Sequence, residues 1–143
     1  MDSERPTRPA RRHLGSILVV EDDPVLALSI EAALRDAGAR AVVICSSIAS
    51  TMEALEQGRP DGIVLDVHLT DRDDGWALAE LVDQLGPRRP RIVFSTGSPD
   101  AIPPDVAHMG AVLEKPYDPA DLIAALSGEE RRGLFARLRG VVG

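Results

Sequence analysis

The stretch ILVVEDDP, residues 17–24, decides the fold because it joins a buried strand to a helix through an acidic turn. A short apolar run without alternation is typical of a strand that is covered on both faces of a sheet. Asp23 can cap a helix that has Pro24 at its first position, where an N–H group is not needed. A cap requires only one acid, so Glu21 and Asp22 are left without a structural role at the end of the strand.

Four further apolar runs follow along the chain, and polar or turn residues bound each of them. The five runs are Ile17–Val20, Arg40–Ile44, Gly62–Leu65, Arg91–Phe94 and Ala111–Leu113. We expect all five to be strands that are buried on both faces.

Helical patterns fill the intervals between these runs. We predict helices from Pro24 to a stop at Gly38, over Ile48–Gln57, over Trp76–Leu85, and from Pro119 behind an Asp118 cap. The interval Asp100–His108 contains Pro103-Pro104, so it allows only a turn or two of helix. Alternating strands and helices predict an α/β fold, a doubly wound parallel sheet with helices on both faces.

Polar residues follow four of the predicted strands directly. Right-handed crossovers bring the carboxyl ends of parallel strands to one edge of the sheet, where ligands bind. We therefore expect five side chains to meet there: Glu21, Asp22, Asp66, Thr96 and Lys115. Lys115 is the only lysine among the sixteen lysine and arginine residues of the chain. A compact ammonium suits a narrow pocket better than the wide guanidinium fork does.

Clustered carboxylates at this edge need a cation. Two like charges about 4 Å apart repel by roughly 4 kcal/mol at an effective dielectric constant of 20. Hard carboxylate oxygens suit Mg²⁺, which is often completed by a phosphate oxygen. With Lys115 as a fixed cation and Thr96 as a hydroxyl, the edge has the groups needed to hold a phosphoryl group.

The motifs together resemble the receiver domain of two-component response regulators. The resemblance spans residues 16–126 and rests on ILVVEDDP (17–24), IVLDVHL (63–69), Gly75, VFSTG (93–97) and LEKPY (113–117). It implies a flavodoxin-like fold with five parallel strands in the order 2-1-3-4-5.

The resemblance also implies a role for each site residue. Asp66 matches the phosphoacceptor, Thr96 the switch hydroxyl and Lys115 the phosphate-binding cation, with a cis Lys115-Pro116 bond. The Mg²⁺ ligands would be Asp22, Asp66 and the backbone carbonyl of His68, with Glu21 contacting the metal, often through water. Such a domain takes its phosphoryl group from a phosphohistidine on a histidine kinase or a histidine phosphotransfer protein. It catalyses its own phosphorylation and dephosphorylation and is not a conventional enzyme.

Four departures from the family pattern concern the loops and the route of the signal. Val112 stands where many receivers carry a switch aromatic residue. The loop from Asp66 to Gly75 is longer than usual, and the segment from Thr96 to Lys115, which contains Pro103-Pro104, is shorter. VFSTGSP (93–99) resembles the Phe-Ala-Thr-Gly pattern of an atypical receiver subgroup.

Composition and the ends of the chain bound the function further. The net charge of −7 argues against direct nucleic-acid binding, and no apolar stretch approaches the roughly 20 residues of a membrane span. We expect a cytoplasmic, single-domain response regulator that acts by protein contacts. Residues 1–15 are interpreted as a disordered basic arm, and residues 127–143 as an extension compatible with a short amphipathic helix.

Two other functions compete with a switching receiver. One is a pseudo-receiver, a binding module that keeps the fold without a phospho-switch. The other is a small phosphatase of the haloacid-dehalogenase type, because residues 66–70 resemble its Asp-x-Asp-x-Thr motif. That chemistry needs an acid two positions after the nucleophile, where this chain has His68.

Overall fold

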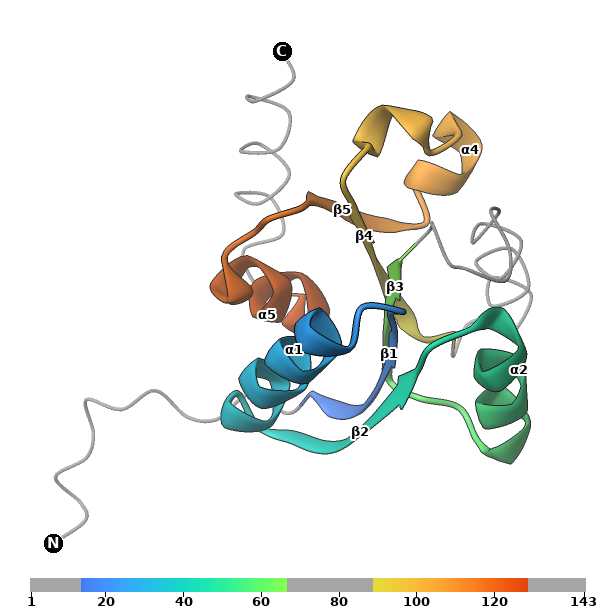
Figure 1. The fold of residues 1–143 in the computed structure, drawn as a ribbon, viewed down its shortest axis with the longest axis vertical. Helices are drawn as coiled ribbons and strands as arrows, with labels where there is room; N and C mark the ends of the chain where they lie inside the picture. The colour runs from blue at the N-terminus through green and yellow to red at the C-terminus, as the bar shows by residue number, and fades with distance from the viewer. Residues whose placement is uncertain (1–13, 67–88, 129–143) are drawn as a thin grey trace, which may run out of the picture.

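A five-stranded sheet in the order β2-β1-β3-β4-β5 forms the centre of the molecule (Figure 1). The computed structural model describes residues 14–66 and 89–128. The strands are β1 (Gly15–Val20), β2 (Ala39–Cys45), β3 (Gly62–Asp66), β4 (Arg91–Thr96) and β5 (Gly110–Glu114). All four neighbouring pairs are parallel. The predicted flavodoxin-like α/β fold and its strand order are confirmed, and each strand extends slightly beyond its predicted bounds.

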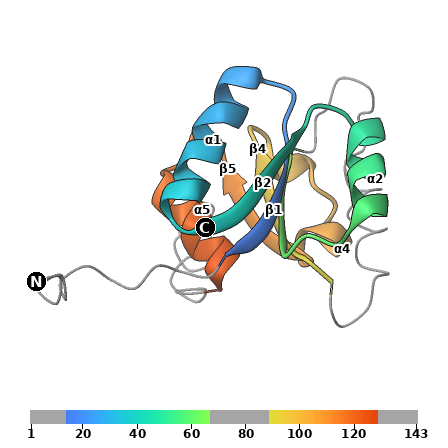
Figure 2. The ribbon, with the colours of Figure 1, turned by 90° about the horizontal axis from the view of Figure 1, so that it is seen from below.

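Helices cover both faces of the sheet. They are α1 (Pro24–Asp36), α2 (Ile48–Gln57), the 3-10 turn η3 (Pro99–Ala101), α4 (Pro104–Ala107) and α5 (Pro119–Ser127). Helices α1 and α5 lie together on one face and α2 lies on the other (Figures 1 and 2). Two prolines keep the segment before β5 to the short pieces η3 and α4, as predicted. The helix predicted over Trp76–Leu85 lies outside the described residues.

The predicted helix caps are present and fix where the site-bearing loops end and helices α1 and α5 begin. Asp23 Oδ1 accepts hydrogen bonds from the backbone N–H groups of Val25 at 3.0 Å and Leu26 at 3.3 Å. Asp118 Oδ1 accepts one from Ala120 N at 2.9 Å. After α1 the chain turns at Gly38, whose φ of 106° is a conformation that favours glycine.

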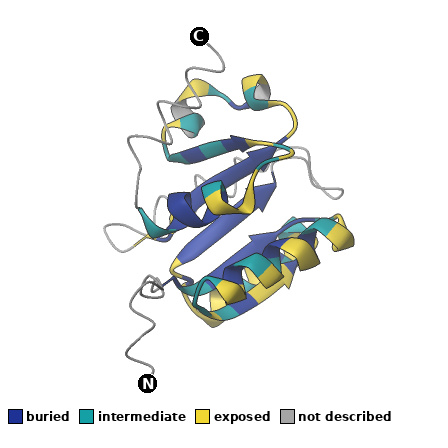
Figure 3. Ribbon diagram, turned by 90° about the vertical axis from the view of Figure 1, so that its left-hand side faces the viewer, coloured by how far each residue is buried: buried dark blue, intermediate teal, exposed yellow. Residues whose placement is uncertain are grey.

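The core consists of two apolar layers, one on each face of the sheet. The layer under α1 and α5 includes Val19, Leu34, Val64, Val93 and Leu122, and the layer under α2 and α4 includes Leu18, Val20, Leu65, Phe94 and Ile102. Figure 3 shows buried residues concentrated along the central strands and exposed residues on the outer sides of the helices. Successive strand residues therefore alternate between the two layers.

Strand β2 departs from the expectation that all five strands are buried on both faces. Val43 is 48% exposed and Ile44 is 36% exposed. The prediction was wrong for this strand because β2 is at the edge of the sheet, where β1 is its one partner among the described strands. Within residues 14–66 and 89–128, no helix has the length and apolarity that a membrane crossing requires.

Candidate functional site

Three carboxylates meet at the carboxyl ends of β1 and β3. One carboxylate oxygen from each of Glu21, Asp22 and Asp66 lies within 4.8 Å of the others. Strand β1 pairs with β3 up to Val20 opposite Leu65, so the next residue of each strand brings Glu21 beside Asp66. Glu21 is 2% exposed and Asp66 is 4% exposed, which removes most of the water that would screen their charges.

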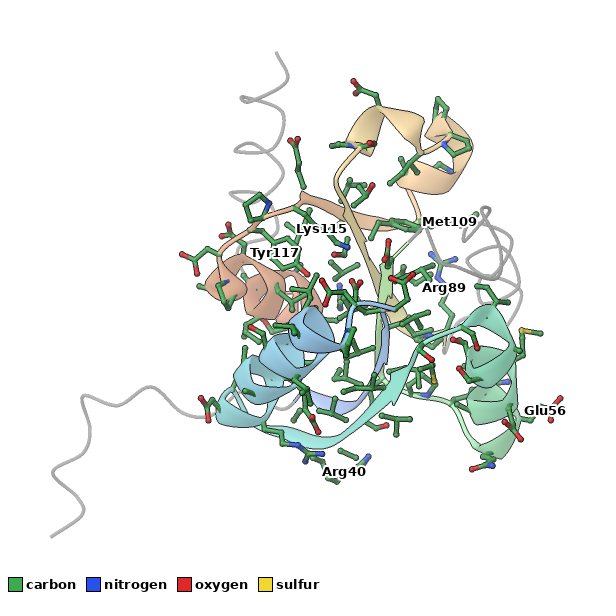
Figure 4. The ribbon with its side chains drawn as sticks, viewed as in Figure 1. Arg40, Glu56, Arg89, Met109, Lys115 and Tyr117 are labelled. Carbon is green, nitrogen blue, oxygen red and sulfur yellow. The ribbon has the colours of Figure 1, made fainter. Side chains whose placement is uncertain are left out.

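Lys115 directly follows the carboxyl end of β5, and its side chain contacts this acidic cluster. Its Nζ atom is 3.1 Å from Glu21 Oε1 and 3.5 Å from Asp66 Oδ2. The backbone N–H of Lys115 donates to the carbonyl of Thr96 at 2.8 Å, which anchors the residue at the end of β4. Figure 4 shows Lys115 and Tyr117 in the segment between β5 and α5. The Lys115-Pro116 bond is cis, as expected.

The electrostatics of the site favour an added cation. Burial, and then the charge of Asp66, raise the pKa of Glu21 above its usual value of 4.5. Burial alone would lower the pKa of Lys115, but the charges of Asp66 and Glu21 raise it above 10.5. Three carboxylates against one ammonium leave an excess of negative charge, and their hard oxygen atoms fit Mg²⁺.

Thr96 lies at the predicted edge, but its hydroxyl is engaged in the following turn. The residue is fully buried, and its Oγ1 accepts a hydrogen bond from Ser98 N at 2.9 Å. Its role as the switch hydroxyl therefore stays a prediction. His68 and Gly75 lie outside the described residues. Asp23 acts as a helix cap, as predicted, and is not among the three acids, Glu21, Asp22 and Asp66, whose positions could hold a metal ion.

Two residues at the site were not singled out from the sequence, namely Ser95 and Tyr117. Ser95 pairs in register with Asp66, and its Oγ lies 3.1 Å from the hydroxyl of Tyr117. Side-chain alternation along β4 could have placed Ser95 on the same face as Asp66. The contact with Tyr117 joins residues 22 positions apart and depends on the fold.

This fold and this site define a known class of protein. The family model of the response regulator receiver domain matches residues 17–127, and the chain belongs to that family. Receiver domains receive phosphoryl groups from histidine kinases.

Two solved structures of receiver domains are similar to this chain in both sequence and fold. The chain is 34% identical to a response regulator receiver protein from Sinorhizobium medicae, with a TM-score of 0.67 over 79% of this chain and 91% of that one. It is 30% identical to the receiver domain of the sensor histidine kinase PA1611 from Pseudomonas aeruginosa, whose structure has a magnesium ion coordinated in the active-site cleft. That match has a TM-score of 0.64 and covers 81% of this chain and 94% of that one.

A curated relative is much longer than this chain. The phyllosphere-induced regulator PhyR of Methylorubrum extorquens is 26% identical over 113 residues, which are 78% of this chain and 42% of PhyR. The chain therefore spans less than half the length of that relative. The assignment of the present chain to an atypical receiver subgroup stays a prediction.

Proposed function

We propose that this chain accepts a phosphoryl group on Asp66 from a phosphohistidine of a histidine kinase or a histidine phosphotransfer protein. The observation that carries the proposal is the position of Lys115 Nζ, 3.5 Å from Asp66 Oδ2 and within the acidic cluster. The acceptor carboxylate and a cation for the incoming phosphoryl oxygen are thus already side by side. Action by protein contacts belongs to the same proposal.

The transfer needs only the carboxylate of Asp66 as a nucleophile. One of its oxygens attacks phosphorus, an O–P bond forms, and the N–P bond of the donor histidine breaks. The electron pair of that bond returns to the imidazole nitrogen. The product is an acyl phosphate, and attack by water on phosphorus later restores the carboxylate and releases inorganic phosphate.

The surrounding residues neutralise charge and orient the phosphoryl group. Lys115 would exchange part of its present contact with Glu21 and Asp66 for a phosphoryl oxygen. Glu21, Asp22 and Asp66 would hold Mg²⁺, which supplies positive charge for the phosphoryl oxygens when it is bound. The magnesium ion in the active-site cleft of the PA1611 receiver domain supports this assignment.

Incubation with acetyl phosphate and Mg²⁺, followed by intact-mass measurement, tests the proposal. The wild type should gain the mass of one phosphoryl group, and Asp66→Asn should gain none. Asp36→Asn provides a matched control, because Asp36 is an exposed acid at the far end of α1 and should not affect the gain. A wild-type protein that stays unmodified with acetyl phosphate and with a phosphohistidine donor would overturn the proposal.

A further inference from the structure

Ser95 lies beside Asp66 on the face of the sheet that carries the site. In β4, Val93 belongs to the core layer under α1 and α5, whereas Phe94 belongs to the opposite layer. Alternation therefore directs Ser95 to the α1–α5 face. Ser95 and Asp66 are register partners on adjacent parallel strands, which run about 4.8 Å apart. A hydroxyl thus lies next to the acceptor carboxylate in the sheet.

Tyr117 reaches this hydroxyl from the loop that carries Lys115. Its ring packs against the core layer under α1 and α5, and its hydroxyl lies 3.1 Å from Ser95 Oγ. Burial raises the pKa of Tyr117, and the charges of Lys115, Glu21 and Asp66 also act on it. The Tyr117 hydroxyl therefore lies within electrostatic range of the charged side chains of the site.

The loop is consequently held to the end of β4 at two points. Lys115 N donates to Thr96 O at 2.8 Å, and two residues later Tyr117 bonds to Ser95. Lysine has a long flexible stem whose conformational freedom must be limited if its ammonium is to stay at one place. Two neighbouring attachments restrict the backbone from which that stem extends.

We propose that the Ser95–Tyr117 hydroxyl pair positions Lys115 for phosphoryl transfer to Asp66. In this proposal the pair acts through the loop of residues 115–117, by way of the 3.1 Å contact between the two hydroxyls, and not as a ligand of the phosphoryl group or the metal. This inference rests on the proposed function and deepens it, because it adds two positioning residues to the site.

Removal of either hydroxyl tests the inference, because Tyr117→Phe keeps the aromatic ring and Ser95→Ala keeps the Cβ atom of the strand residue. Tyr117→Phe and Ser95→Ala should each slow phosphorylation by acetyl phosphate at saturating Mg²⁺ by about fivefold, the worth of one hydrogen bond. The Mg²⁺ concentration for half-saturation should stay within about twofold, since both variants keep the three carboxylates of Glu21, Asp22 and Asp66 that could hold the ion. General loosening of the fold would impair both quantities together. Thermal unfolding of each variant confirms that it is folded.

A double-mutant cycle with Lys115→Ala separates positioning from packing. If Tyr117 acts through Lys115, Tyr117→Phe should have no further effect on the rate when Lys115 is already alanine. Ser127→Ala is the matched control, because it removes a hydroxyl that bonds to Ala124 O in α5, and it should leave the rate unchanged.

Three outcomes overturn the inference. Unchanged rates in both Tyr117→Phe and Ser95→Ala would do so while the proposed function stands, and so would a fivefold loss that persists in the Lys115→Ala background. A wild type that takes up no phosphoryl group would instead remove the proposed function and this inference with it.

Discussion

At the scale of single residues, the position of Lys115 gives a physical reason for the only lysine in the chain. Its Nζ lies between Glu21 Oε1 and Asp66 Oδ2, and the side chain is 26% exposed. A small ammonium with three donors can contact both carboxylates and still turn one donor to a phosphoryl oxygen. The wide planar guanidinium of arginine has a different reach and a fixed donor geometry.

Lys115→Arg should therefore impair the site although the charge is kept. We expect beryllofluoride, a mimic of the phosphoryl group, to bind about tenfold more weakly, a loss of about 1.4 kcal/mol. Titration calorimetry in saturating Mg²⁺ measures this. Arg35→Lys makes the reverse exchange in the exposed ion pair with Glu31 and should leave the affinity unchanged. Equal affinity in wild type and Lys115→Arg would mean that the choice of lysine is incidental.

Glu21 predicts a pH dependence of stability in the absence of Mg²⁺. Burial and the charge of Asp66 raise the pKa of Glu21, so the folded protein keeps this proton at pH values where the unfolded chain has lost it. The contribution of Glu21 to the free energy of unfolding thus falls as pH rises above about 4.5 toward the raised pKa. Glu21→Gln has no such proton to lose.

Urea unfolding of wild type and Glu21→Gln, below pH 4.5 and at neutral pH, measures this effect. Relative to the variant, the wild type should be less stable at neutral pH than in acid. The assignment would be contradicted if the difference in free energy of unfolding between the two proteins did not change with pH, or if the wild type became relatively more stable as pH rises.

At the scale of elements, the start of helix α1 distinguishes Asp23, which caps the helix, from the two candidate metal ligands that precede it in the chain. Asp23 accepts hydrogen bonds from Val25 N and Leu26 N, whereas Glu21 and Asp22 point their oxygens into the acidic cluster with Asp66. Three consecutive acids therefore have two different tasks.

Asp23→Ala should destabilise the fold by about 1 kcal/mol through loss of the cap. Asp23→Asn keeps a capping oxygen, so its free energy of unfolding should fall by only a small part of that amount. Urea unfolding gives the stability, and Mg²⁺ titration should give similar affinities for all three proteins. An affinity for Mg²⁺ that falls as steeply in Asp23→Asn as in Asp22→Asn would make Asp23 a ligand instead.

The elements also show how far sequence alone reaches. Apolar runs and proline-led caps predicted all five strands, α2 with its bounds, and the starts of α1 and α5. The pattern also predicted burial of β2 on both faces, which was wrong, since an edge position depends on the order of strands in the sheet. The gathering of Glu21, Asp22, Asp66 and Lys115 followed from topology. The hydrogen bond of Thr96 with Ser98 depends on the local geometry of a turn, and that of Ser95 with Tyr117 depends on the fold, neither of which residue types encode.

At the scale of the whole molecule, the doubly wound sheet brings together residues that are 94 positions apart in the chain. The site therefore exists only in the folded state, and a ligand that binds there favours folding. Binding of Mg²⁺ should stabilise the whole domain by mass action.

At a Mg²⁺ concentration of one hundred times its Kd, the free energy of unfolding should rise by about 2.7 kcal/mol. Asp22→Ala should lose most of this gain because one carboxylate of the cluster is missing. Asp36→Asn, an exposed acid away from the cluster, should keep it. Urea unfolding with and without Mg²⁺ provides the comparison, and an equal gain in Asp22→Ala would place the ion elsewhere.

The chemical identity of the phosphorylated residue tests the central claim most directly. After incubation with acetyl phosphate and Mg²⁺, borohydride reduces an acyl phosphate of aspartate to homoserine, which peptide mass spectrometry locates in the chain. The account predicts homoserine at position 66 and at no other acid of the cluster. An unmodified Asp66, or a modified Glu21 or Asp22, would contradict it.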